Sequence, residues 1–172
     1  MLKMDQLFKS ENESARSNRI IVEGDPGSGK STLCKALALE WSKSKRQDGC
    51  SNCGIEKFDF VICLYAGLLK HHERIEDVIV SYLLPKDSSI NRPINPYDIR
   101  IFLSTKRVCI IIDSYDEAFH ENNLLNQIVR GDIFRNATLM MTSRFNYLRE
   151  SLHSFDKKLS ILGYDEEQQI EH

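Results

Sequence analysis

The sequence lacks a strong excess of charge of either sign. Its 172 residues include 23 Lys and Arg against 25 Asp and Glu, which gives a formal net charge of only −2. A chain without a marked positive excess has no overall field that attracts nucleic acid or an anionic membrane surface. We therefore expect neither nucleic acid nor a membrane as a partner, and any phosphate binding has to be local.

Long apolar runs and targeting signals are missing as well. No stretch approaches the roughly 18 consecutive apolar residues that a membrane span requires. The first residues, MLKMDQLFKSENESARSN, lack the apolar core of a secretory signal. Of only five cysteines, Cys34, Cys63 and Cys109 lie inside apolar runs, where cysteine behaves as a small hydrophobic residue. These features predict a reducing, cytoplasmic setting.

Short apolar runs rich in β-branched residues alternate with segments of helical periodicity. The runs predict five strands, at Arg19–Glu23, Phe58–Tyr65, Val108–Asp113, Ala137–Thr142 and Lys158–Leu162. The helical segments run from Lys30 to about Lys45, then Arg74–Leu84, Pro96–Ser104 and Leu124–Val129. This alternation is typical of an α/β fold in three layers, with helices flanking a central, mostly parallel five-stranded sheet.

A phosphate-binding motif follows the first predicted strand. In GDPGSGKST the pattern G-x-x-x-x-G-K-[ST] is satisfied and a helix begins at once, which favours a P-loop NTPase over a plain glycine-rich turn. Glycines let successive N–H groups face one phosphate, and the helix N-terminus adds partial positive charge. Lys30 is expected to reach the β- and γ-phosphates, and the Ser31 hydroxyl to bind Mg²⁺. The predicted nucleotide-binding residues are Gly24, Asp25, Pro26, Gly27, Ser28, Gly29, Lys30, Ser31 and Thr32.

The third predicted strand ends in acidic residues that form a Walker B pattern, VCIIIDSYDE. Ligands of open α/β sheets bind at the carboxyl ends of the strands, so we expect Asp113 beside the phosphate loop, where it holds Mg²⁺ together with Ser31. Asp116 or Glu117 then orients or deprotonates an attacking water, and the sequence does not decide between them. Taken alone, these residues also fit a core strand that runs into a solvated acidic turn.

The fourth predicted strand delivers Thr142, Ser143 and Arg144 to the same edge. Arg144 is a candidate sensor of the γ-phosphate, because its guanidinium stays charged and can make two parallel contacts with phosphate oxygens. The alternative is a surface arginine at the end of a strand. With Asp116 and Glu117, Arg144 completes the predicted catalytic group.

Five segments together resemble the NACHT domain of NLR-type STAND ATPases. They are GDPGSGKSTL, FDFVICLY, VCIIIDSYDEA, LLNQIVRGDIFRNATLMMTSRF and ILGYDEEQQIEH. The resemblance implies that Gly24 to Thr32 bind ATP or ADP, that Asp113 is the Mg²⁺ acid, that Asp116 is the catalytic acid and that Arg144 is the sensor arginine. Three positions near the site depart from the family pattern: Ser114 and Tyr115 stand where the family usually has glycine and leucine, and Phe145 where it has proline.

The same resemblance sets the expected organisation and function. Residues 1–18 form a polar lead-in, residues 19–162 a NACHT-like nucleotide-binding domain, and residues 163–172 the start of a truncated helical subdomain of a longer protein. Family members are switches that self-associate in innate immune or cell-death signalling, which implies a slow Mg²⁺-dependent ATPase. Two alternatives stay open: a P-loop kinase for a small acceptor, for which Lys70 to Arg74 makes a poor lid, and a scaffold that binds nucleotide without hydrolysing it.

Overall fold

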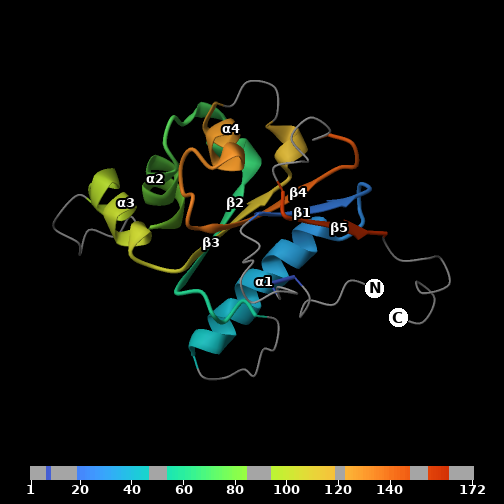
Figure 1. Cartoon of the computed structure of the whole chain (residues 1–172), viewed down its shortest axis with the longest axis horizontal. Helices are drawn as coiled ribbons and strands as arrows, with labels where there is room; N and C mark the ends of the chain where they lie inside the picture. The colour runs from blue at the N-terminus through green and yellow to red at the C-terminus, as the bar shows by residue number, and fades with distance from the viewer. Residues whose placement is uncertain are drawn as a thin grey trace.

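The computed structural model describes residues 7–8, 19–46, 54–84, 94–118, 123–147 and 155–162. Its strands form one sheet in the order β2-β3-β4-β1-β5, with every neighbouring pair parallel (Figure 1). The strands are β1 (Arg19–Gly24), β2 (Phe60–Tyr65), β3 (Val108–Asp113), β4 (Thr138–Ser143) and β5 (Lys157–Ile161). The predicted five-stranded sheet is confirmed, and the largest difference in a boundary is at the start of β2, Phe60 instead of Phe58.

Helical segments connect the strands. They are α1 (Lys30–Lys45), the 3₁₀ helix η2 (Ala66–His71), α2 (Ile75–Val78), the π-helical turn η3 (Ile79–Leu83), α3 (Pro96–Ser104), the 3₁₀ turn η4 (Tyr115–Glu117) and α4 (Asn123–Arg130). The single helix predicted at Arg74–Leu84 is wrong in detail, because α2 continues into η3. There the N–H of Leu84 donates to the carbonyl of Ile79 at 3.1 Å, which is π-helical spacing. Among the described residues, no helix has both the length and the apolar character needed to cross a membrane.

The two faces of the sheet carry separate hydrophobic cores. On one face α1 packs through Cys34 and Leu37. On the other face the core includes residues of η2, α2, η3, α3 and α4. Figure 1 shows α1 on one side of the sheet and α2, α3 and α4 on the other. This is the three-layer arrangement expected for a P-loop NTPase.

Two described residues of the predicted polar lead-in are apolar and buried. Leu7 is fully buried and Phe8 is 7% exposed, and both belong to the core that α1 covers. The Phe8 ring meets the Phe58 ring edge to face, with 5.4 Å between centroids. The lead-in therefore contributes to the packing of the domain at this point.

The parallel register brings the ends of β1, β3 and β4 to one edge of the sheet. Side chains alternate between the two faces of a strand. Because Val22, Ile111 and Met140 belong to the core under α1, the residues two positions later also face α1. These later residues are Gly24, Asp113 and Thr142. The fold thus places the phosphate loop and the Walker B acid together, next to the beginning of α1.

Candidate functional site

The phosphate loop joins the end of β1 to the start of α1, and two of its glycines are required for different reasons. A Cβ on Gly24 would lie 2.7 Å from the carbonyl oxygen of Ile161 in β5, so the close approach of the two strands excludes a side chain. Gly29 is the N-cap of α1 and has a φ of 97°, in the left-handed region that favours glycine. A Cβ at Gly29 would meet nothing within 4 Å, so the space beside it is open.

The N-terminus of α1 is a set of free hydrogen-bond donors. It has no side-chain cap and no acidic residue in its first turn. The first N–H groups of a helix have no partners within the helix, so this end presents donors and partial positive charge. Lys30 adds its ammonium group, whose Nζ lies 2.8 Å from the carbonyl oxygens of both Gly24 and Asp25. An ammonium has three protons, so one is left for a further acceptor.

Hydrogen bonds hold the Asp113 carboxylate by one of its oxygens. Thr142 Oγ1 donates to Asp113 Oδ1 at 2.6 Å, and the Cys34 thiol lies 3.8 Å from the same oxygen. Thr142 Oγ1 in turn accepts the N–H of Ser114 at 2.9 Å. Burial, reinforced by the charge of Asp113, raises the pKa of the Cys34 thiol, so the thiol keeps its proton and can donate. No hydrogen bond from a described residue ends on Oδ2, which leaves that oxygen for a cation.

Lys30 and Asp113 lie on the same side of the sheet. Cys34 follows Lys30 by one helical turn, and residues four apart in a helix share a face. Since Cys34 contacts Asp113, the face of α1 that begins with Lys30 is turned toward the Walker B carboxylate. Lys30 and Asp113 on opposite faces of the sheet could not serve one metal-bound phosphate, and in the described part of the chain they share a face.

The turn η4 brings Asp116 to Arg144 at the end of β4. Arg144 Nε pairs with Asp116 Oδ2 at 2.9 Å, and the Asp116 side chain is 6% exposed while that of Arg144 is 54% exposed. Glu117 is exposed, and among the described residues no cation pairs with it. The two candidate acids therefore differ: Asp116 already has a partner, whereas Glu117 is open to solvent.

These groups surround an open cavity of about 340 Å³. Its lining residues are Pro26, Gly27, Gly29, Lys30, Ser31, Thr32, Ser114, Asp116, Glu117 and Arg144. Four predicted residues do not line it: Gly24, Asp25, Ser28 and Asp113. Ser114, which lines the cavity, and Thr142, which bridges Ser114 and Asp113, had no predicted role in the site. The only signal for both was their position at the end of a strand.

Unpartnered polar atoms gather at this edge. Of the five buried side-chain oxygens that have no hydrogen-bond partner in the described part of the chain, three belong to Glu23, Ser28 and Ser143. Ser28 is in the phosphate loop, and Glu23 and Ser143 are paired in the register of β1 and β4. Buried polar groups are normally hydrogen-bonded, and exceptions often mark the place of a water, ion or ligand. None of the three lines the cavity, and Glu23 and Ser143 face the side of the sheet opposite α1, so only Ser28 belongs to the phosphate loop itself.

The few side chains available as metal ligands at this edge suit Mg²⁺, which needs few protein ligands, better than a metal that is bound by protein side chains alone. Within the described ranges, no group of three or more His, Cys, Asp or Glu could hold a metal ion. Mg²⁺ keeps several waters and is usually bound by one or two carboxylates together with phosphate oxygens. Asp113 and Ser31 are therefore the residues that would hold Mg²⁺ here, with a phosphate chain supplying the remaining oxygens.

Known proteins of one family are similar to this chain. A model of the NACHT domain family matches residues 18–171. NLR family CARD domain-containing protein 4 from Xenopus tropicalis is 24% identical over 140 residues, which cover 81% of this chain and 13% of that protein. NACHT, LRR and PYD domains-containing protein 12 from Homo sapiens is 25% identical over 196 residues, covering 99% of this chain and 17% of that protein. The chain thus spans less than a fifth of either relative.

The fold is also similar to that of a solved structure. The Aeropyrum pernix ORC1 protein, solved in complex with DNA, matches with a TM-score of 0.54 and 18% identity. The match covers 92% of this chain and 42% of that one. At this identity the likeness concerns the fold alone, and it agrees with a central parallel sheet flanked by helices.

Proposed function

The chain belongs to the NACHT domain family, a group of P-loop NTPases of the STAND type, and from that premise we propose that it binds ATP or ADP with Mg²⁺ as a switch. The switch hydrolyses ATP slowly and self-associates through this domain. It works within a larger NLR-like protein of innate immune or cell-death signalling, a setting supported by the NLR relatives.

Three groups at one edge of the sheet support nucleotide binding. They are the uncapped N-terminus of α1, the Lys30 ammonium and the Asp113 carboxylate with its free Oδ2. The helix N–H groups and Lys30 hold phosphate oxygens, and Asp113 and Ser31 hold the metal. Mg²⁺, when bound, neutralises charge that develops on the β- and γ-phosphates. The donors of this edge suit the negative phosphate oxygens of a metal-bound polyphosphate, and the oxygen acceptors suit its positive metal ion.

The Asp116–Arg144 pair supplies a contact that differs between ATP and ADP. A ligand shifts a conformational equilibrium only through different interaction energies with the two states. A γ-phosphate competes with Asp116 for the Arg144 guanidinium, and a released Asp116 is then free to orient a water. ADP has no γ-phosphate and leaves the 2.9 Å ion pair in place. Arg144 therefore couples the identity of the nucleotide to the position of η4.

Titration with labelled ATP, ADP and GTP, with and without Mg²⁺, tests the binding site. We expect Lys30→Ala to weaken nucleotide binding by at least about tenfold, through loss of a charged phosphate contact. Lys43→Ala is the matched control, because Lys43 lies on the same helix and is paired only with Glu40 among the described residues. Equal binding by the Lys30 variant and the native chain would remove the phosphate-loop assignment.

The switch is tested through Arg144 and through the rate of hydrolysis. Arg144→Ala is expected to weaken ATP binding by about tenfold and leave ADP binding nearly unchanged. Turnover slower than about one per minute, far below typical enzyme rates, favours a switch. Phosphate transfer to a small acceptor would favour a kinase instead, although no described residue of Lys70 to Arg74 lines the cavity. Binding with no turnover would favour a scaffold.

A further inference from the structure

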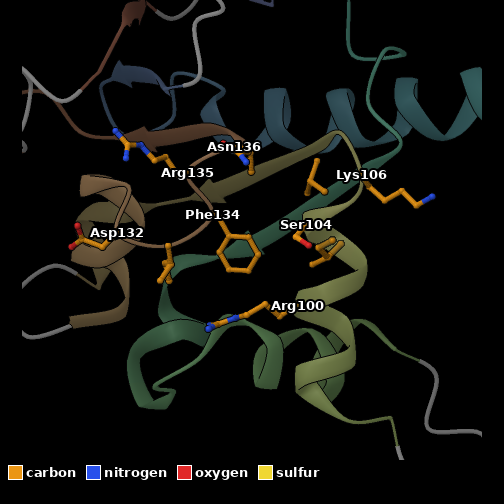
Figure 2. Close-up of a pocket in the computed structure, with 11 residues that line it drawn as sticks. Arg100, Ser104, Lys106, Asp132, Phe134, Arg135 and Asn136 are labelled. Carbon is orange, nitrogen blue, oxygen red and sulfur yellow. The ribbon is translucent and has the colours of Figure 1, made fainter.

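A second cavity lies at the opposite edge of the sheet from the phosphate loop (Figure 2). It has a volume of about 280 Å³ and lies between α3 and the loop that leads from α4 into β4. Val108 and Ala137, which stand at the beginnings of β3 and β4, contribute to its wall. The phosphate loop lies beyond the other ends of these strands, on the order of 20 Å away. The cavity is therefore separate from the nucleotide site.

The floor of this cavity is apolar. Leu103, Ile133 and Phe134 line it with Val108 and Ala137. Figure 2 shows the Phe134 ring near the centre of the lining residues. Pockets for drug-sized ligands usually measure about 300–1,000 Å³. A cavity just below that range accepts one bulky apolar side chain or a single ring.

The turn that carries Phe134 has a defined backbone conformation. Phe134 has a φ of 51°, a conformation that bulky residues rarely adopt and that persists only where the surroundings enforce it. The Ala137 N–H donates to the Phe134 carbonyl at 3.0 Å and closes the turn. At the start of the same loop, Arg19 packs against Gly131, which leaves no room for a side chain there. A preformed apolar surface lowers the ordering cost of binding.

The rim of the cavity is cationic. Arg100, Lys106 and Arg135 line it against one acid, Asp132, and in Figure 2 the charged ends of Lys106, Arg135 and Asp132 all point outward from the cavity. Arg100 is fixed by its ion pair with Glu76, a carboxylate that is fully buried. Lys106 and Arg135 are exposed, and neither has an acidic partner among the described residues. The surplus of positive charge favours an occupant with acidic groups on either side of its apolar one.

Exposed apolar side chains continue beyond the cavity along α3. Tyr97 and Ile101 are 58% and 49% exposed. Neighbouring exposed apolar groups of this kind are typical of protein interaction sites. A polypeptide can cover both the cavity and this helix surface, whereas a small metabolite covers only the cavity.

We propose that this cavity is a docking site for an acidic peptide segment of a partner protein. The segment inserts one bulky apolar side chain against Phe134 and places its acidic residues near Lys106 and Arg135. Docking of this kind uses an anchor residue in a preformed pocket, with charged contacts around it that exclude water. It does not depend on the nucleotide function, because no residue is shared between the two cavities.

The test uses the whole 172-residue chain and a fluorescein-labelled peptide with a central leucine flanked by glutamates on both sides. Anisotropy is expected to show saturable binding that weakens as salt is added. Ser104→Trp fills the cavity from the exposed end of α3 and should weaken binding at least about tenfold. Lys106→Glu with Arg135→Glu should have a similar effect. Arg130→Glu, an exposed charge reversal outside the lining, should stay within about twofold of the native affinity.

The controls separate docking from misfolding and from other ligands. Unchanged nucleotide binding by Ser104→Trp shows that the variant is folded. Peptides with serine in place of leucine, or lysines in place of glutamates, should not bind. Absence of saturable binding to the native chain would overturn the docking site, and so would equal binding by native protein and Ser104→Trp. Phenylacetate that binds as tightly as the peptide would also overturn it, in favour of a small-molecule site.

Discussion

Ser114 adopts a backbone conformation in which glycine is favoured. Its φ of 58° and ψ of 52° lie in the left-handed region, at the corner between β3 and η4. Ser114→Gly removes the clash of Cβ in this region, and we expect it to raise the free energy of unfolding by about 1 kcal/mol in urea denaturation. Ser114→Ala keeps the Cβ and should change that energy by less than about 0.5 kcal/mol. Equal stabilisation by both variants would contradict backbone strain as the cause.

Thr142 joins two chain segments through a single hydroxyl group. It is fully buried, accepts the Ser114 N–H and donates to Asp113. Thr142→Val keeps the shape of the side chain but leaves both partners without this bond, and the free energy of unfolding should fall by about 2–3 kcal/mol. The Mg²⁺ dependence of nucleotide binding should weaken as well. Thr142→Ser retains the hydroxyl and should preserve the metal dependence; loss of that dependence in Thr142→Ser would rule out the hydroxyl as its source.

The residues around the nucleotide site were only partly predictable. Lys30, Ser31 and Asp113 could be found because a motif and a strand end are local patterns in the sequence. Two contacts of the site join residues that are distant in the sequence. They are the hydrogen bond between Ser114 and Thr142 and the ion pair between Asp116 and Arg144. Such contacts depend on the register of β3 against β4, which local patterns do not contain. Which predicted residues act in catalysis is still a prediction.

At the scale of elements, Arg19 ties the first strand to the end of α4. Arg19 Nε donates to the carbonyl of Val129 at 2.8 Å and Nη2 to that of Ile128 at 3.2 Å. The last carbonyls of a helix have no partners within the helix, so the guanidinium caps them. Arg19→Met should lower the free energy of unfolding by about 2 kcal/mol and speed amide exchange in Asn123–Arg130.

An exposed arginine provides the comparison for that cap. Arg46 follows α1 at the surface, and no side-chain hydrogen bond of Arg46 to a described residue is present. Arg46→Met should therefore change the free energy of unfolding by less than about 0.5 kcal/mol. If Arg19→Met and Arg46→Met lowered the free energy of unfolding by the same small amount, and amide exchange in α4 were unaltered, the Arg19 cap would contribute nothing measurable to stability.

Strands were easier to predict than the helices of the second layer. A strand buried on both faces, such as β3, is a continuous apolar run and could be located from composition alone, whereas the edge strand β5 gave a weaker pattern because its residues are only partly buried or exposed. The segment after β2 has no such simple pattern. A helix was predicted from Arg74, but α2 changes to π-helical spacing at Ile79, and the preceding η2 was not predicted. The choice between 3₁₀, α and π spacing follows from packing onto the sheet, which a single sequence does not reveal.

For the molecule as a whole, a buried thiol makes stability depend on pH. Burial raises the pKa of Cys109 well above its ordinary value of 9.0. When the pH exceeds the ordinary pKa of 9.0, the unfolded chain loses a thiol proton that the folded chain keeps. The unfolded state then binds fewer protons, so the free energy of unfolding falls as the pH rises, by about 1.4 kcal/mol per pH unit for this thiol.

Urea denaturation at several values between about pH 8 and pH 10 checks this dependence. Burial raises the pKa of Cys63 in the same direction, so some decline should persist when Cys109 is replaced. Cys109→Ala should show a shallower decline than the native chain, whatever its absolute stability. An identical slope in the two proteins would exclude the Cys109 thiol as a contributor.

The place of β1 inside the sheet affects how the chain can be assembled during synthesis. Its hydrogen-bonded neighbours are β4 and β5, which are synthesised after the other three described strands of the sheet. While the residues before Thr138 are being translated, β1 has neither of its neighbouring strands, so both of its edges are unpaired. Pairings between distant segments form slowly and leave edges exposed to aggregation in the meantime. A nascent chain stalled ahead of β4 is therefore a natural client for a chaperone that shields unpaired strands.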